Sequence, residues 1–193
     1  MKCEKIIKKH KSLIDKAIEY MNKVQDKEHN YEHVKDVIYF SLTLLEKIKD
    51  KFDINIDAVI IACFWHDVGR IKCDIGHENL SAIMLKKEMV KENYDAIFID
   101  NCIEAIRYHK WNMNPKTIEG KIIKDADKLA WLGVNRWKEC IKYDQNLDSI
   151  VDLLPKLRNE ILYFDESKKI YDEEIVKLVK LLYSLKFDYV NKS

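Results

Sequence analysis

A histidine and an aspartate stand side by side at the end of the most apolar stretch of the chain. The run from Ala58 to Trp65 is too hydrophobic for a surface helix, and His66 and Asp67 follow it directly. A carboxylate at the end of a buried helix loses its hydration and meets the negative end of the helix dipole. It therefore needs a positive partner, and the adjacent imidazole favours a metal ion in that role.

Four more histidines lie at predicted helix ends or on apolar faces. His33 borders the inward seam of the second predicted helix, and His29 comes four residues earlier. His77 stands just before the fourth predicted helix, and His109 continues the apolar face of the fifth. One such residue alone is typical of a core histidine bonded to a backbone carbonyl, but five together with an inward carboxylate favour ligands. The sixth histidine, His10, lies among lysines and is predicted to be solvated.

A second acidic pair is expected on the sixth predicted helix. Asp127 shares a helical line with Ile123 and Trp131, so its side chain is predicted to point inward. Asp125 has a lysine about one turn away on each side, which places it towards a charged flank. Asp127 is therefore the better ligand candidate. Asp125 is expected to be either a structural residue beside the ligands or a solvated helix charge.

The elements that must position these residues are predicted to be helices. The chain has 4 Gly and 2 Pro in 193 residues, so it contains few residues that end helices or form tight turns. Apolar residues recur at helical spacing, and no strand pattern is stronger. The expected fold is all-α, a compact bundle of roughly seven to nine helices. The predicted helices span residues 5–27, 31–51, 58–67, 78–91, 94–110, 119–134, 137–142, 149–163 and 173–189.

The composition is that of an ordinary globular chain of one domain, with 47% hydrophobic and 35% charged residues. A net charge of +1 gives no general attraction to nucleic acid or to a membrane surface. No apolar run approaches the roughly 18 residues of a membrane span, and the charged amino-terminal segment is unlike a signal peptide. The five cysteines form no Cys-x-x-Cys pair and are expected to be free thiols, so the protein is predicted to be cytoplasmic.

In their order and their neighbours, these residues resemble the HD-domain phosphohydrolases. The lone His33, the adjacent His66-Asp67 and the later Asp127 match that family's motif. Three more stretches resemble the small bacterial and archaeal members: Gly76-His77-Glu78-Asn79-Leu80-Ser81-Ala82, Ile106-Arg107-Tyr108-His109, and Glu119-Gly120-Lys121-Ile122-Ile123-Lys124-Asp125-Ala126-Asp127-Lys128-Leu129. The resemblance predicts one HD domain over residues 1–193. Its motif-bearing core spans about 24–137, and C-terminal helices in 138–193 pack on it.

The resemblance implies one divalent metal ion with four ligands: His33, His66, Asp67 and Asp127. In dinuclear members two further positions hold a second metal, with Asp67 as the bridging carboxylate; here they are His77 and His109. Mixed imidazole and carboxylate ligation suits Mn, Fe, Ni, Zn or Mg, and the sequence does not choose among them. Three other residues are expected to support the ligands: His29, Glu78 and Asp125.

The chemistry implied by this ligand set is attack of a metal-bound hydroxide on phosphorus. The residues expected to be catalytic are His66, Asp67, Arg70 and Lys128. Cationic side chains would hold the phosphate, and the candidates are Arg70, Lys110, Lys128 and Arg136. Arg70 is favoured because it follows the His-Asp pair closely.

The substrate implied is a small phosphomonoester, nucleotide or related phosphate ester, and the protein is expected to be a monomer or a homodimer. The family's signatures for guanosine tetraphosphate, cyclic di-guanylate and dNTP substrates are absent, which makes those substrates less expected. The simplest interpretation of the tryptophans near the motifs is core packing. The alternative is that Trp111 stacks on a nucleobase.

One position departs from the family pattern. The chain has Ala130 where members often have an aspartate, three residues after Asp127. Two other functions stay open beside the phosphohydrolase. One is a diiron oxygenase of the HD superfamily, and the other is a non-catalytic metal- or nucleotide-binding regulatory domain.

Overall fold

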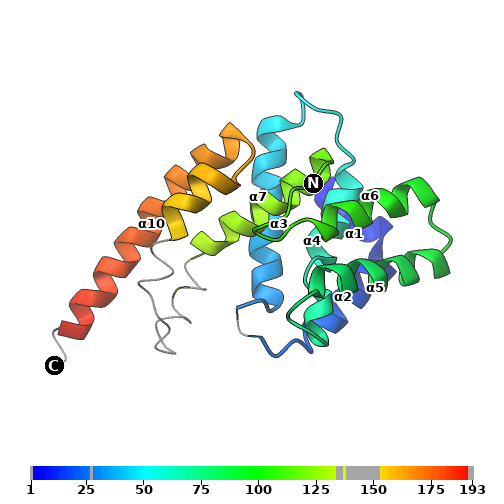
Figure 1. Ribbon diagram of the computed structural model, residues 1–193, viewed down its shortest axis with the longest axis horizontal. Coiled ribbons are helices and arrows are strands. Elements are labelled where there is room, and N and C mark those ends of the chain that lie inside the picture. The colour runs from blue at the N-terminus through cyan, green and yellow to red at the C-terminus, as the bar shows by residue number, and fades with distance from the viewer. Residues whose placement is uncertain (1, 27, 134–136, 138–152, 191–193) are drawn as a thin grey trace.

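The computed structural model of the protein describes residues 2–26, 28–133, 137 and 153–190 (Figure 1). These residues form helices and no β-strand, which confirms the predicted all-α bundle. The α-helices are α1 (Lys2–Lys9), α2 (Lys11–Met21), α3 (Tyr31–Ile48), α4 (Ile56–Trp65), α5 (His77–Lys91), α6 (Ala96–Arg107), α7 (Ile118–Leu129) and α10 (Asp165–Val190). Short single-turn elements are η1 (Val68–Ile71), η2 (Ala130–Leu132) and η3 (Leu157–Ile161).

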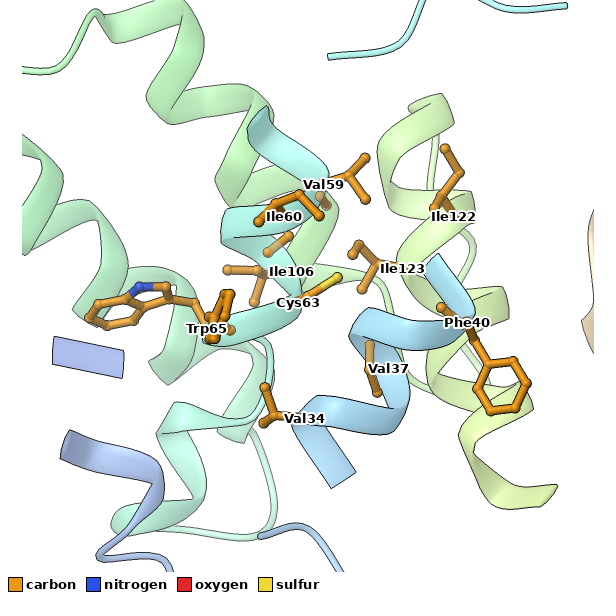
Figure 2. Close-up of a cluster of buried hydrophobic side chains, with 14 of the residues drawn as sticks. Val34, Val37, Phe40, Val59, Ile60, Cys63, Trp65, Ile106, Ile122 and Ile123 are labelled. Carbon is orange, nitrogen blue, oxygen red and sulfur yellow. The ribbon is translucent and has the colours of Figure 1, made fainter. Parts of the chain in front are cut away.

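Helix α4 lies at the centre of the bundle. Its residues from Ala58 to Trp65 are all buried, as expected for a helix that is apolar on every side. The Asn55 side chain begins the helix by accepting a hydrogen bond from the Ala58 N–H. Figure 2 shows α4 side chains packed between those of α3, α6 and α7, with the labelled residues Val34, Val37, Phe40, Val59, Ile60, Cys63, Trp65, Ile106, Ile122 and Ile123.

The first predicted helix is broken in the structure. A single helix over 5–27 was expected, but α1 ends and α2 begins on either side of His10. His10 is 3% exposed, so the prediction that it is solvated is wrong. Its ring nitrogens lie 2.8 Å from the Tyr94 hydroxyl and 3.0 Å from Asp57 Oδ2. The neighbouring lysines take the solvent-facing positions, while the break lets the imidazole reach partners on other segments.

The C-terminal part differs from its predicted boundaries. Helix α10 begins at Asp165, eight residues before the predicted helix 173–189. Helix α7 ends at Leu129 and continues as η2, so the predicted helix 119–134 is shorter than expected. The N-terminal part of α10 packs against α3 and α7, and its C-terminal part extends away from the bundle (Figure 1). Apart from Trp137, the predicted helix 137–142 lies outside the described residues.

Two further observations concern the described residues. None of their helices has the length and apolar character that a membrane crossing requires. Four of the cysteines are unpaired, and Cys140 lies outside the described part of the chain.

Candidate metal centre

Six buried histidine and aspartate side chains meet where several helices begin or end. His33 lies in the first turn of α3, where the Asn30 side chain accepts hydrogen bonds from the Glu32 and His33 N–H groups. His66 is the residue that ends α4, and Asp67 follows it. The remaining three come from the start of α5, the segment after α6 and the last turn of α7: His77, His109 and Asp127.

Two glycines allow the start of α5 to lie close to this centre. Gly76 has φ +83°, a left-handed conformation that favours glycine, and it places His77 at the first position of the helix. Gly69 in η1 packs directly on the same helix start. A Cβ at this position would lie 2.2 Å from the His77 carbonyl oxygen and 2.9 Å from the Ser81 nitrogen. No larger residue fits there without a backbone shift.

The first group consists of His33, His66 and Asp127. Their potential ligand atoms all lie within 4.8 Å of one another. His33 Nε2 is 3.3 Å from His66 Nε2 and 3.1 Å from Asp127 Oδ1. All three residues are buried, so an ion bound between them would exchange water for protein ligands.

The second group consists of Asp67, His77 and His109, which meet the same 4.8 Å criterion. His77 Nε2 lies 3.3 Å from His109 Nε2 and 3.0 Å from Asp67 Oδ1. The three side chains are buried like those of the first group.

The Asp67 carboxylate lies between the two groups. Its Oδ2 is 3.8 Å from His33 Nε2 and 3.5 Å from His66 Nε2. Its Oδ1 is 3.0 Å from His77 Nε2 and 3.6 Å from His109 Nε2. Neither oxygen accepts a well-formed hydrogen bond from the described residues, although the side chain is 1% exposed. One oxygen thus faces each group, which is the arrangement of a bridging carboxylate.

The histidine tautomers also suit a metal. His66 Nδ1 lies 2.8 Å from the Cys63 carbonyl oxygen, and His109 Nδ1 lies 2.7 Å from that of Ile106. His77 makes the equivalent contact with the carbonyl three residues before it. When Nδ1 donates its proton to a carbonyl, Nε2 presents a lone pair. Two such Nε2 atoms 3.3 Å apart repel unless a proton or a cation lies between them, so these residues fit a divalent cation.

The pKa shifts of Asp67, Asp127 and His33 match this interpretation, whereas for His66 burial lowers the pKa but Asp67 raises it above the usual value. Burial acts against ionisation of Asp67, but the imidazoles of His66, His109 and His77 hold its pKa well below the usual range. The pKa of Asp127 is also held well below its usual range despite burial, mainly by Lys128 and then by His33. Burial lowers the pKa of His33 to about 4. These shifts favour ionised carboxylates and a neutral His33, which are the protonation states of metal ligands.

The candidate cations differ in how firmly they are already paired. Arg70 Nε lies 3.0 Å from Asp67 Oδ1, and its Nη1 contacts the carboxylates of Asp26 and Asp74. Lys128 Nζ lies 2.6 Å from Asp127 Oδ2. The fourth candidate, Arg136, lies outside the described residues, so the comparison covers the carboxylate pairing of Arg70, Lys110 and Lys128.

Lys110 is the most loosely held of these cations. Its side chain is 32% exposed, and its nearest carboxylate oxygen is Glu78 Oε2 at 3.5 Å. Glu78 is buried, and no described residue donates a hydrogen bond to this oxygen. Lys110 therefore has the greatest freedom to contact a ligand.

A cavity of about 530 Å³ opens over both groups, within the range of small-molecule sites. The Trp111 and Trp131 rings form part of its wall, with centroids 6.3 Å apart. The cavity is lined by Asp26, Glu28, His29, Asp67, Arg70, Asp74, Ile75, His77, His109, Lys110, Trp111, Asn112, Asp127, Lys128 and Trp131.

The structure shows the positions and bonding partners of two residues that were expected beside the ligands, His29 and Asp125. His29 lines the cavity, with its ring 5.5 Å from that of His33 and its Nδ1 2.7 Å from Asp26 Oδ2. Asp125 is fully buried, so the interpretation as a solvated helix charge is wrong. It accepts hydrogen bonds from the Tyr163 and Phe164 N–H groups, and burial raises its pKa to about 6.

Sequence reasoning missed three residues near the site. Asp26 bonds to both His29 and Arg70, and nothing in its sequence neighbourhood indicates this. Trp131 lines the cavity, although it was grouped with packing residues. Lys124 is 2% exposed, and its spacing of three residues before Asp127 could have placed it on the inward face.

The fold and the site together define an all-helical protein in which two buried His/Asp groups share one carboxylate. The family model of the HD domain matches residues 30–132, more than half of the chain, so the chain belongs to the HD-domain family. This confirms the resemblance seen in the sequence.

Comparison with solved structures supports the same fold. The chain is similar to the crystal structure of a predicted HD superfamily hydrolase from an uncultured Thermotogales bacterium. The TM-score is 0.73 with 18% sequence identity, and the match covers 93% of each chain. At this identity the likeness concerns the fold. Comparison with curated proteins finds no match.

Proposed function

We propose that the protein is a metal-dependent phosphohydrolase that acts on a small phosphomonoester or nucleotide. The observation that carries this proposal is the Asp67 carboxylate, with one oxygen facing each of two buried His/Asp groups. Membership of the HD-domain family supports it. The packing of α10 on α3 and α7 supports a single domain over 1–193.

The chain's own residues would hold one or two divalent cations. His33, His66 and Asp127 would bind one, and His77 and His109 would bind a second, with Asp67 shared between them. A cation bound here would acidify water and shield phosphoryl oxygens. The Nδ1 contacts to backbone carbonyls would keep each imidazole oriented with Nε2 towards the ion. The mixed donor set is compatible with Mn, Fe, Ni, Zn or Mg.

The cavity residues would bind the substrate. Lys110 is the first candidate for a phosphate oxygen, because it is partly exposed on the cavity wall. Arg70 is paired with three carboxylates. It is therefore better placed to orient Asp67 than to leave these partners and bind a substrate. Lys128 would neutralise Asp127 and the developing phosphate charge. The Trp111 ring could stack on a flat substrate group such as a nucleobase.

The test is elemental analysis of the purified protein, followed by hydrolysis of a phosphate-ester panel with each metal in turn. We expect a chelator to abolish hydrolysis and one added metal to restore it. His66→Gln should lose both metal and activity, whereas His10→Gln, a buried histidine outside the site, should keep both. Hydrolysis that survives complete removal of metal would contradict the proposal.

A diiron oxygenase is the second candidate, because the shared carboxylate could equally hold two iron ions. Iron near two per chain, together with oxygen consumption and no hydrolysis on the panel, would favour it. Stabilisation by nucleotides without any turnover would instead indicate a regulatory binding domain.

A further inference from the structure

A buried lysine ties the C-terminal part of the chain to one wall of the cavity. Lys124 lies on α7, three residues before Asp127, and is 2% exposed. It does not line the cavity, so its charge is not directed at a bound substrate. Instead its Nζ donates hydrogen bonds to the backbone carbonyls of Trp111 (3.1 Å) and Met113.

The segment that Lys124 holds is the irregular connection between α6 and α7, residues 108–117. It supplies three consecutive cavity residues, which are Lys110, Trp111 and Asn112. Its own backbone makes few regular hydrogen bonds, such as Met113 N to Lys110 O at 3.1 Å. A connection of this kind takes its conformation from contacts with neighbouring elements.

Tyr163 adds a second contact from the C-terminal part. Its hydroxyl donates to Asn114 Oδ1 at 3.0 Å, and its ring centroid lies 5.4 Å from Lys124 Nζ. Its backbone N–H and that of Phe164 bond to the buried Asp125 carboxylate. Two consecutive residues of α7 thus make hydrogen bonds in two directions. Lys124 bonds to the cavity wall, and Asp125 bonds to the segment that precedes α10.

We propose that Lys124 and Tyr163 are positioning residues that hold the 108–117 segment as the substrate-binding wall of the cavity. The C-terminal part of the chain then sets substrate affinity in a site whose candidate metal ligands all come from residues 33–127. This inference rests on the proposed function for its kinetic consequence, but the placement of the wall can be measured without turnover.

Two matched pairs of variants test the proposal. Lys124→Met removes the two bonds to the wall, and Lys121→Met is its control, because Lys121 Nζ also lies near the Tyr163 ring (5.7 Å). Tyr163→Phe removes only the hydroxyl bond to Asn114. Its control is Tyr171→Phe, which removes a hydroxyl bond to the Leu154 carbonyl elsewhere in the C-terminal part.

The first measurement is amide hydrogen exchange of residues 108–117. We expect exchange to become about tenfold faster in Lys124→Met and roughly threefold faster in Tyr163→Phe, with both controls unchanged. The second is steady-state hydrolysis of 4-nitrophenyl phosphate by the metal-loaded protein. KM should rise about tenfold in Lys124→Met, with metal content and kcat close to wild type.

The acceptor provides a rescue experiment. Asn114→Leu should behave like Tyr163→Phe, whereas Asn114→Asp keeps an oxygen that accepts the hydroxyl bond and should behave like wild type. Should Lys124→Met fail to fold, Tyr163→Phe and the two Asn114 variants decide the question.

Two results would overturn the proposal. The first is that Lys124→Met and Tyr163→Phe both show the same amide exchange in residues 108–117, and the same KM, as their control variants. The other is a loss of metal rather than of substrate affinity, which would mean that Lys124 acts on the ligands of α7. A wild-type protein that hydrolyses no phosphate ester would refute the proposed function, and the exchange measurement would still decide the placement of the wall.

Discussion

Replacing Asp67 by asparagine removes one negative charge from the centre and keeps the size of the side chain. The two carboxylate oxygens lie between 3.0 and 3.8 Å from the Nε2 atoms of four histidines. The side chain is 1% exposed, so solvent and salt screen its charge weakly. A cation held by these nitrogens would therefore interact with Asp67 at short range.

The size of the effect follows from this separation. Two unit charges about 4 Å apart at an effective dielectric constant near 20 interact by about 4 kcal/mol. The bound cation is divalent, so about 4 kcal/mol is a lower bound on this interaction. Because about 1.4 kcal/mol corresponds to a factor of ten, Asp67→Asn should weaken metal binding by at least about a thousandfold. The asparagine oxygen could still act as a neutral ligand, so binding should weaken without being abolished.

Thermal unfolding with and without metal measures this change. At a metal concentration about a thousand times its Kd, the wild-type protein gains about 4 kcal/mol, or a rise in Tm of about 8–16 °C for a chain of this size. Under the same conditions Asp67→Asn should gain at most about 0.4 kcal/mol, or about 1–2 °C.

Asp74→Asn is the matched control. Asp74 also contacts Arg70 and lines the cavity, but its side chain is 81% exposed and belongs to neither ligand group. It should show the wild-type metal shift. A rise in Tm of more than half the wild-type value in Asp67→Asn would mean that the Asp67 charge contributes little to metal binding.

Three further predictions concern the surroundings of the centre. Burial acts to raise the pKa of Asp57, but its bonds with His10 and Lys9 lower that pKa below the usual range. The stabilisation of the folded protein by ionised Asp57 is therefore present above the usual aspartate pKa and is lost as the pH falls through the folded-state pKa. Asp57→Asn should therefore reduce the free energy of unfolding by about 1 kcal/mol at neutral pH, with a smaller difference in urea titrations at about pH 3. Gly69→Ala should destabilise the protein by about 2 kcal/mol or more in denaturant titrations, because its Cβ would meet the His77 carbonyl at 2.2 Å; wild-type stability in this variant would contradict that packing. Lys110→Met should raise KM for a phosphate ester about tenfold with unchanged metal content, since this loosely paired cation lies on the cavity wall; steady-state kinetics with metal analysis would show a mistaken assignment as an unchanged KM.

Much of the fold could be predicted from the helical spacing of apolar residues in the sequence. A stretch that is apolar on every side, such as 58–65, can only be a buried element, and α4 is the centre of the bundle. The neighbouring helices were recognisable from their apolar stripes. Their boundaries were less so, because the break at His10 has no strong breaker residue and depends on contacts with Asp57 and Tyr94.

The six ligand candidates could also be predicted from the sequence, because residue type, order along the chain and position in a helix are local properties. The structure brings them together in two groups around Asp67. Spacing alone does not predict this division into two groups, which the resemblance to the HD-domain family implied. Which oxygen of Asp67 faces which histidines depends on how the ends of α3, α4, α5, α6 and α7 meet.

The surroundings of the site depended on segments far apart in the chain. The sequence places Arg70 three residues after Asp67, but only the fold adds the carboxylate of Asp26. It places Lys124 and Asp125 on α7 but does not indicate that they fasten the 108–117 segment and Tyr163. Helical spacing determines which face of a helix a residue occupies. Its partner, its burial and hence its protonation are set by whatever chain packs on that face, and that information is in the tertiary structure.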